Sequence, residues 1–186
     1  MGNSRGTVVS EYIDTKRLRL KPSTLADLDA LANRDRVRFE TLIGATSPDP
    51  FEPPPETADA LELFQSKHAE DPASSPWLIR WIIERAERRL VGSVGFIGPP
   101  DQFGVLQFGY SIYPADQNRG YATEAANGLT TWACRQPNVQ HIQAAVRYDN
   151  WPSQRVAIKS GFTFVREIES EHEGLMGVWE LRCPHG

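Results

Sequence analysis

Residues 116–125 combine side chains and spacing that suit the binding of a phosphate group. Arg119 carries a full positive charge, and Gly120 has no Cβ that would keep a phosphate away from the backbone. The segment follows a strand-like run that closes at Pro114, and it leads directly into an apolar helical pattern. The first turn of such a helix has free backbone N–H groups, and the helix dipole adds partial positive charge. The sequence therefore predicts a pyrophosphate-binding turn between a strand and a helix.

Other patterns that carry chemistry are absent from the sequence. Residues 92–95 do not have the spacing of a G-x-S-x-G nucleophile elbow, and there is no G-x-x-x-x-G-K-[ST] segment. The four histidines have no metal-ligand spacing, so we expect no metal. Cys134 and Cys183 lie far apart in the chain, and two thiols without a C-x-x-C pair fit a reducing cytosol.

Hydrophobic periodicity predicts the elements that must position the turn. Strand patterns occupy residues 16–21, 77–83, 90–97, 103–113, 139–146, 162–168 and 175–181. Helical patterns occupy residues 25–34, 35–43, 57–70, 121–135 and 151–160. Five prolines between residues 44 and 55 exclude a regular helix or a central strand there. We interpret that segment either as an exposed connection or as a mobile wall over a substrate cleft.

The order of these elements predicts an α+β fold. Three consecutive strands over residues 77–113 form an antiparallel meander. A right-handed crossover through the helix after the turn makes the strand at 139–146 parallel to the strand before the turn. We expect a mixed, mostly antiparallel sheet of about seven strands, flanked by about four helices. Residues 14–183 form a single domain in this interpretation, and residues 1–13 are a flexible N-terminal tail.

Composition limits the partners of the protein. Its 186 residues carry a net charge of −4 and a pI of about 5.6, which argues against general nucleic-acid binding. No run approaches the roughly 18 apolar residues of a membrane span, so we expect no membrane contact. The polar N-terminus lacks the apolar core of a signal peptide. These features predict a cytoplasmic protein, either a monomer or a homodimer.

Residues 117–122, Q-N-R-G-Y-A, fit the pattern Q/R-x-x-G-x-G/A and resemble the GNAT superfamily of acyl-CoA-dependent N-acyltransferases. Residues 123–125 extend the match to Y-A-T-E-A, which is similar to the RimJ/RimL-type branch of ribosomal-protein alanine N-acetyltransferases. Residues 150–153 with 159–162 resemble the N-x-x-S…K-x-G-F of that branch, and residues 109–112 resemble its G-Y-x-hydrophobic strand. The resemblance runs from about residue 14 to residue 182 and implies a GNAT fold.

The resemblance implies that acetyl-CoA (coenzyme A) is the cosubstrate and that the turn binds its pyrophosphate. The residues assigned to the cofactor in this way are Gln117, Asn118, Arg119, Gly120, Tyr121, Ala122 and Thr123. Backbone groups near Ile112 and Tyr113 would bind and polarise the acyl carbonyl. Asn150, whose amide both donates and accepts, would hold the pantetheine arm. Ser153 would lie near the sulfur, as the general acid that protonates the leaving thiolate.

The general base stays unassigned. The attacking amine must be neutral, so a carboxylate, a histidine or a water chain must accept its proton. Many relatives carry a glutamate where this chain has residues 107–108, Gln-Phe, and a Glu-Gly pair where it has residues 165–166, Val-Arg. Glu84, Glu124 and Glu167 remain as candidates, although each also suits a structural or solvated position.

The resemblance predicts an N-acetyltransferase in which a primary amine attacks acetyl-CoA directly in a ternary complex. The acceptor is an amine-bearing partner, either a peptide N-terminus or a small molecule. Two alternatives stay open: a non-catalytic acyl-CoA-binding sensor or scaffold of the same fold, and an acyltransferase that uses a different acyl-CoA. Asp49, Glu52, Glu56 and Asp59 either suit a cationic acceptor or belong to a solvated loop.

Overall fold

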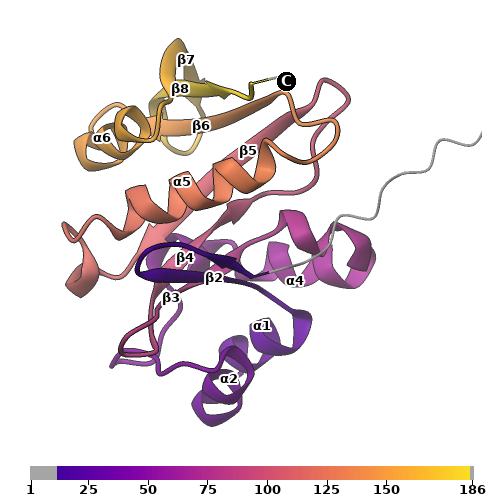
Figure 1. Ribbon diagram of the computed structural model, residues 1–186, viewed down its shortest axis with the longest axis vertical. Coiled ribbons are helices and arrows are strands. Elements are labelled where there is room, and N and C mark those ends of the chain that lie inside the picture. Colours follow the sequence, from indigo (N-terminus) through magenta and orange to yellow (C-terminus); the bar gives the residue numbers. More distant parts are fainter. Residues whose placement is uncertain (1–11, 185–186) are drawn as a thin grey trace, which may run out of the picture.

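The computed structural model describes residues 12–184, and one eight-stranded sheet runs through them (Figure 1). The strands are β1 (Ile13–Asp14), β2 (Leu18–Pro22), β3 (Arg80–Glu84), β4 (Arg89–Phe96), β5 (Val105–Ile112), β6 (His141–Arg147), β7 (Thr163–Ser170) and β8 (Gly174–Arg182). The α-helices are α1 (Leu25–Ala32), α2 (Arg36–Ile43), α3 (Pro55–Asp59), α4 (Leu61–Glu70), α5 (Tyr121–Ala133) and α6 (Trp151–Lys159). Two 3₁₀ helices, η1 (Pro72–Trp77) and η2 (Pro114–Asp116), complete the described elements. The strand order across the sheet is β1-β2-β3-β4-β5-β6-β8-β7.

The strands pair as the sequence predicts. β2, β3, β4 and β5 are antiparallel neighbours, and β5 pairs with β6 in parallel. β6, β8 and β7 continue antiparallel, with β7 and β8 as the closing hairpin. The mixed, mostly antiparallel α+β fold is therefore confirmed, and α5 lies in the crossover between the two parallel strands.

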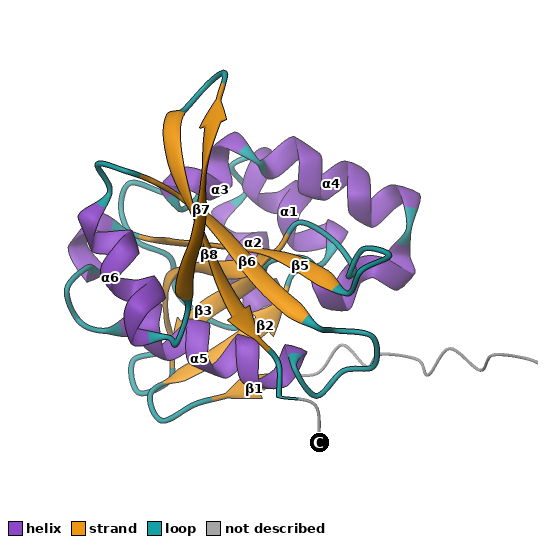
Figure 2. Cartoon of the chain, turned by 90° about the horizontal axis from the view of Figure 1, so that it is seen from above, coloured by secondary structure: helices purple, strands orange, loops and turns teal. Residues whose placement is uncertain are grey.

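Two apolar cores lie on opposite faces of this sheet. In β3, Ile82 belongs to the core that includes residues of α5, whereas Trp81 and Ile83 belong to the core that includes residues of α1, α2 and α4. Successive side chains of a strand point to opposite faces, so a strand that is apolar along its length fills both cores. Figure 2 shows α5 on one side of the sheet and α4 on the other. Both faces of the central strands are thus covered, and their ends are held in fixed positions.

The two parallel strands pair only along part of their length. Residues 105–107 of β5 are in register with residues 141–143 of β6. Beyond this register β5 continues to Ile112 and β6 to Arg147 without further pairing to each other. The strands therefore diverge and leave a gap in the sheet. Because they are parallel, the segments that follow them, the turn before α5 and the start of α6, leave the sheet at this same end.

The bounds of several elements differ from the sequence interpretation. The described residues contain six α-helices where about four were expected, because the short pattern over 35–43 forms a helix of its own, α2, and the pattern over 57–70 is divided at Ala60 into α3 and α4. Residues 77–79 are not part of a strand, since η1 ends at Trp77 and β3 begins at Arg80. Residues 1–11 of the expected tail lie outside the described residues. Ile13, the first residue of β1, pairs with Leu20 of β2 and lies one residue before the expected start of the domain.

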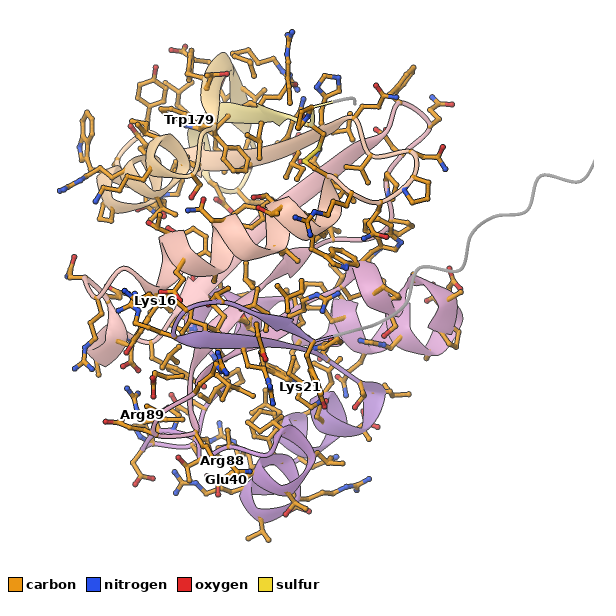
Figure 3. All side chains as sticks on the ribbon, in the orientation of Figure 1. Lys16, Lys21, Glu40, Arg88, Arg89 and Trp179 are labelled. Atoms are coloured by element: carbon orange, nitrogen blue, oxygen red, sulfur yellow. A yellow bond between two sulfur atoms is a disulfide. The ribbon has the colours of Figure 1, made fainter. Side chains whose placement is uncertain are left out.

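Cys134 and Cys183 form a disulfide, with Cα atoms 5.1 Å apart (Figure 3). The expectation of two thiols was therefore wrong. Cys134 follows the last residue of α5 and Cys183 follows the last residue of β8, and the fold brings these ends together across a sequence separation of 49 residues. The bond ties the last strand to the helix that begins at the predicted phosphate-binding turn.

Candidate functional site

A cleft of about 540 Å³ lies between the end of β5, the first turns of α5 and α6, and the start of α3. Its walls come from residues 55–56, 110–112, 116–118, 120–123 and 150–153, together with Arg155, Val156 and Lys159. In Figure 1 the beginning of α5 and the whole of α6 lie on the same side of the molecule. The cleft therefore opens at the end of the sheet where β5 and β6 diverge.

The turn before α5 presents backbone N–H groups without a protein partner. Asn118 (φ 61°) and Gly120 (φ 80°) adopt left-handed backbone conformations, which curl the chain into the first turn of the helix. The helix has no side-chain N-cap, unlike α1 and α6. Within the described residues, none of the N–H groups of residues 118–123 donates to a protein acceptor. Such a row of donors at a helix start suits a phosphate group.

Asp116 and Gln117 anchor the beginning of this turn to the sheet. The guanidinium of Arg89, labelled in Figure 3, donates to both carboxylate oxygens of Asp116 at 2.7 and 2.8 Å, and Asp116 is only 2% exposed. The hydrogen bonds from Arg89 to Asp116 raise the pKa of the guanidinium above its usual value, so the guanidinium stays charged. Gln117 Nε2 donates to the carbonyl of Ile112 at 3.2 Å. The turn is thereby fixed against the end of β5.

Glu124 anchors the other end of the turn to the β1–β2 hairpin. Its carboxylate accepts hydrogen bonds from Thr15 Oγ1, from the Arg17 backbone N–H and from Arg17 Nε, each at 2.7 Å. Arg17 also donates to the carbonyl of Arg119 at 3.0 Å and lies over the ring of Tyr121, 4.7 Å from its centroid. Burial alone would raise the pKa of Glu124, but these hydrogen bonds together hold it below its usual value. Glu124 is therefore a charged structural anchor.

Asn150 and Ser153 come together at the start of α6. Asn150 Oδ1 accepts a hydrogen bond from the Ser153 N–H at 3.1 Å, so the asparagine caps the helix and its amide nitrogen can still donate into the cleft. The hydroxyl of Tyr110 donates to Ser153 Oγ at 3.0 Å. Burial raises the pKa of Tyr110, and the nearby Glu56 carboxylate raises it further, although the hydrogen bond to Ser153 opposes both effects. Tyr110 is thus a protonated donor at neutral pH.

A carboxylate that the sequence indicated only as one of four acidic residues, and not as a base, lies in the same cleft. Glu56, in α3, accepts a hydrogen bond from Ser111 Oγ at 2.6 Å, and its own N–H donates to the same oxygen at 3.3 Å. The next residue, Thr57, shares a hydrogen bond with Ser93. Ser93 and Ser111 are register partners in β4 and β5, so two consecutive residues of α3 are held by two facing residues of the sheet. The only signal in the sequence was the acidic character of residues 49–59.

Most of the residues predicted from sequence are brought together. The lining of the cleft includes Ile112, Gln117, Asn118, Gly120, Tyr121, Ala122, Thr123, Asn150 and Ser153. Tyr113 and Arg119 are not part of it. The hydroxyl of Tyr113 donates to the carbonyl of Glu52 at 2.7 Å, and its backbone N–H donates to the carbonyl of Val91. The side chain of Arg119 is mostly exposed, 3.8 Å from Asp116.

None of the three glutamates considered as a base lines the cleft. Glu84 accepts hydrogen bonds from the N–H groups of Ala86 and Glu87, and Glu167 accepts one from the hydroxyl of Tyr148. Glu124 faces the β1–β2 hairpin, as described above. Each of them therefore has a structural partner that is not part of the cleft lining.

The segment from residue 44 to residue 55 is attached to the fold at several points. Thr46 bridges to Arg89, and Arg36 donates to the carbonyls of residues 47 and 48. Phe51 packs on Phe39, with ring centroids 5.6 Å apart. The segment leads into α3 and so delivers Pro55 and Glu56 to the cleft.

Between residues 12 and 184, no group of three or more His, Cys, Asp and Glu residues is arranged to hold a metal ion. No helix in this range is both long enough and apolar enough to cross a membrane.

Comparison with known sequences identifies relatives along most of the chain. A model of the acetyltransferase (GNAT) domain matches residues 17–163. The uncharacterized N-acetyltransferase YjdG of Bacillus subtilis (strain 168) is 29% identical over 153 residues, which are 81% of this chain and 88% of that protein.

Solved structures of acetyltransferases have the same fold. The ribosomal-protein-S5-alanine acetyltransferase of Vibrio fischeri superposes with a TM-score of 0.65 at 18% identity, over 93% of this chain and 97% of that one. RimL, a ribosomal L7/L12 α-N-protein acetyltransferase solved in complex with coenzyme A, superposes with a TM-score of 0.64 at 15% identity, over 92% of this chain and 98% of that one. These likenesses confirm the fold predicted from the sequence.

Proposed function

The chain belongs to the GNAT acetyltransferase family, and on this premise we propose that it binds acetyl-CoA in the cleft and transfers the acetyl group to a primary amine. The observation that carries the proposal is the row of partnerless N–H groups of residues 118–123, at a helix start that borders the cleft. The acceptor is a protein N-terminus or a small amine. RimL, which has a similar fold, is named as an α-N-protein acetyltransferase.

The residues of the cleft fit the parts of coenzyme A. The N–H row and the positive end of α5 would hold the pyrophosphate, and Gly120 leaves that approach open because it has no side chain. The amide nitrogen of Asn150 and the backbone groups in the gap between β5 and β6 would hold the pantetheine arm, as a sheet edge binds an extended peptide. Acetyl-CoA supplies an acetyl group already activated as a thioester.

The backbone N–H of Ile112 is the group that would polarise the acetyl carbonyl. Tyr113 cannot do so with its own N–H, because that group is bonded to the carbonyl of Val91 in β4. In an antiparallel pair the N–H groups of alternate residues point to opposite edges of the strand. The N–H of Ile112 therefore points to the edge where β5 no longer pairs with β6. A donor in this position stabilises the negative charge that develops on the carbonyl oxygen.

Ser153 would protonate the thiolate as it leaves. The hydrogen bond from Tyr110 occupies one lone pair of Ser153 Oγ. The proton of the serine hydroxyl therefore remains free to be donated into the cleft. Ser153 would act as the general acid, and Tyr110 would hold it in position.

The proposal is tested with acetyl-CoA and the variant Gly120→Asp. We expect acetyl-CoA at 100 times its Kd to stabilise the wild-type protein by about 2.7 kcal/mol. This corresponds to an increase in Tm of several degrees, measured by thermal shift. Gly120→Asp places a carboxylate beside the pyrophosphate and should abolish the increase. Gly174→Asp is the matched control, because Gly174 has a similar φ of 72° with open space around it, at the first residue of β8.

Gly174→Asp should lower the Tm of the free protein but keep its increase with acetyl-CoA. No stabilisation of the wild type at any acetyl-CoA concentration would contradict the proposal. Release of coenzyme A thiol in the presence of peptides and small amines tests the transfer step. Binding without turnover on any acceptor would leave an acyl-CoA-binding protein that is not a transferase.

A further inference from the structure

We propose that Glu56 is the general base that accepts the proton of the acceptor amine, and that Ser111 holds it in place. The inference rests on the proposed function and assigns the step that the sequence left open. This chain has no carboxylate directly before its G-Y segment, where residues 107–108 are Gln-Phe. Glu56 comes from a different element, the short helix α3.

Hydrogen bonds between α3 and the sheet fix the position of Glu56. Ser111 donates to its carboxylate at 2.6 Å, and the backbone of Glu56 donates back to Ser111. Thr57 is buried and bonded to Ser93, the register partner of Ser111. The carboxylate is nevertheless exposed at the cleft, so it can receive a proton from a substrate and pass it to water.

Glu56 and Ser153 approach the end of β5 from opposite faces of the sheet. The side chains of Tyr110 and Ile112 lie with the core that includes α5, and Tyr110 bonds Ser153. Ser111 lies between them in sequence, so its side chain points to the other face, where it meets α3. An acetyl carbonyl held at the N–H of Ile112 would have Ser153 on one side and Glu56 on the other. The acceptor amine therefore enters from the side of α3.

The chemical step balances with these two groups. Glu56 takes a proton from the ammonium form of the acceptor and releases it to water. The free amine nitrogen uses its lone pair to form the C–N bond, the C–S bond breaks, and its electron pair leaves on the sulfur. The nitrogen then loses its second proton to water, the thiolate takes a proton from Ser153, and water returns a proton to the serine oxygen. The products are the acetylated amine and the free thiol of coenzyme A.

Other charged and titratable groups line the same cleft. They are Tyr110 from β5, Asp116 from η2, and Arg155 and Lys159 from α6. The two basic residues line the same cleft as the acyl donor, whereas Glu56 is the acidic residue on the α3 side. A cationic amine is therefore attracted to the side of the carbonyl that is opposite Ser153.

The test compares Glu56→Gln with two kinds of nucleophile. The probes are a peptide with a free N-terminal amine, a small primary diamine, and hydroxylamine, which is uncharged at neutral pH and needs no base to become nucleophilic. We expect Glu56→Gln to lower kcat/KM for the primary amines by at least about 10²-fold, because general bases typically contribute about 10²–10⁴-fold. The rate with hydroxylamine should change by less than about five-fold, since no proton must be removed before the attack.

The pH profile and three further variants make the test specific. The half-maximal rate with a primary amine should move to higher pH in Glu56→Gln, because only water then accepts the proton. Glu56→Asp should keep the wild-type pH dependence at a reduced rate. Ser111→Ala should lower the rate with primary amines, but by less than Glu56→Gln does. Asp59→Asn removes the same charge from the same helix outside the cleft, so it should leave all rates unchanged.

The outcomes separate the inference from the function on which it rests. Equal losses with both kinds of nucleophile would show that Glu56 only shapes the cleft, and unchanged rates would remove it from catalysis. Either result overturns the inference while leaving the transferase in place. If the wild type binds acetyl-CoA but releases no thiol with any probe, the transferase proposal fails, and the inference fails with it. All variants are first shown to keep the increase in Tm with acetyl-CoA.

Discussion

Ser153 is the residue on which release of the thiol would depend, and its surroundings define how it would act. Its backbone N–H is used by Asn150 and its oxygen by Tyr110. The first bond fixes the start of α6, the second orients the side chain, and neither consumes the hydroxyl proton. The serine is thus prepared as a donor, while the tyrosine behind it stays protonated because burial raises its pKa.

We expect Ser153→Ala to lower kcat by no more than about 10²-fold, the lower end of the range for general acid catalysis. The loss is small because a thiolate is already a good leaving group. Tyr110→Phe should cost less, about 10-fold or below, since it removes only the hydrogen bond that orients Ser153. Steady-state kinetics with a primary amine measure both effects, with KM for acetyl-CoA nearly unchanged. A larger loss for Tyr110→Phe than for Ser153→Ala would identify the tyrosine as the proton donor.

The residues of the two sides of the cleft were not equally predictable. Gly120 and Asn150 belong to short contiguous patterns, and the physical properties of a strand, a turn and a helix already indicate a phosphate site there. Glu56 is separated from Ser111 by 55 residues, and no local pattern distinguishes it from the other acidic residues of its segment. A long-range pair of this kind appears only when α3 is placed on the sheet. The sequence therefore predicts the side of the cleft that would bind acetyl-CoA. It leaves open the side that would bind the acceptor amine.

At the scale of elements, the turn before α5 is a loop fixed at both ends. Asp116 binds β4 through Arg89, and Glu124 binds the hairpin of β1 and β2 through Thr15 and Arg17. The hydrogen-bond donors of the turn are thus prearranged before any ligand arrives, which lowers the entropic cost of binding. β1 has only two residues, yet the hairpin that it opens holds this turn.

Removing the charge of Glu124 should weaken the binding of acetyl-CoA without changing the chemical step. We expect Glu124→Gln to raise the Kd for acetyl-CoA by roughly five-fold, because residues outside a ligand contact typically modulate binding by about 1 kcal/mol. Isothermal titration measures the Kd, and kcat should stay the same. Arg19→Gln is the control, since the exposed pair of Arg19 and Asp14 lies on the same hairpin without touching the turn. Equal effects of both variants would contradict a specific role for Glu124.

The contribution of Glu124 to stability should also depend on pH in a defined direction. Its pKa is lower in the folded protein than its usual value of 4.5, so the folded state favours the charged form. The contribution is present above that value and is lost as the pH falls through the lower pKa of the folded state. The difference in Tm between the wild type and Glu124→Gln should therefore shrink on acidification below about pH 5. A difference that is constant or grows over this range would contradict the assignment.

For the molecule as a whole, the disulfide joins the end of α5 to the end of β8. The sequence predicts the sheet order well, because strand and helix periodicities are strong along this chain and the crossover has one favoured hand. It could not predict the disulfide, since 49 residues separate the cysteines and only the packing of β8 beside β6 brings them near each other. The division of α3 from α4 was missed for a related reason. Its cause is the attachment of α3 to β4 and β5, which the helical pattern does not contain.

The disulfide should make a large contribution to the stability of the folded protein. Closing a loop of this length is worth roughly 4 kcal/mol in the chain-entropy account. We expect the double variant Cys134→Ser/Cys183→Ser to melt on the order of 10 °C below the wild type, measured by calorimetry. A reducing agent should lower the Tm of the wild type by a similar amount and leave that of the double variant unchanged. A wild type that is insensitive to reduction under denaturing and refolding conditions would contradict this contribution.

The same bond turns the last part of the chain into a covalent ring. Residues 134–183 enclose β6, α6, β7 and β8, and the exposed turn at residues 171–173 is one point on that ring. A single backbone cut in this turn opens the ring without dividing the molecule. The fragment that carries the cleft and the fragment that carries β8 stay linked through Cys134 and Cys183, and the last strand keeps its place between β6 and β7.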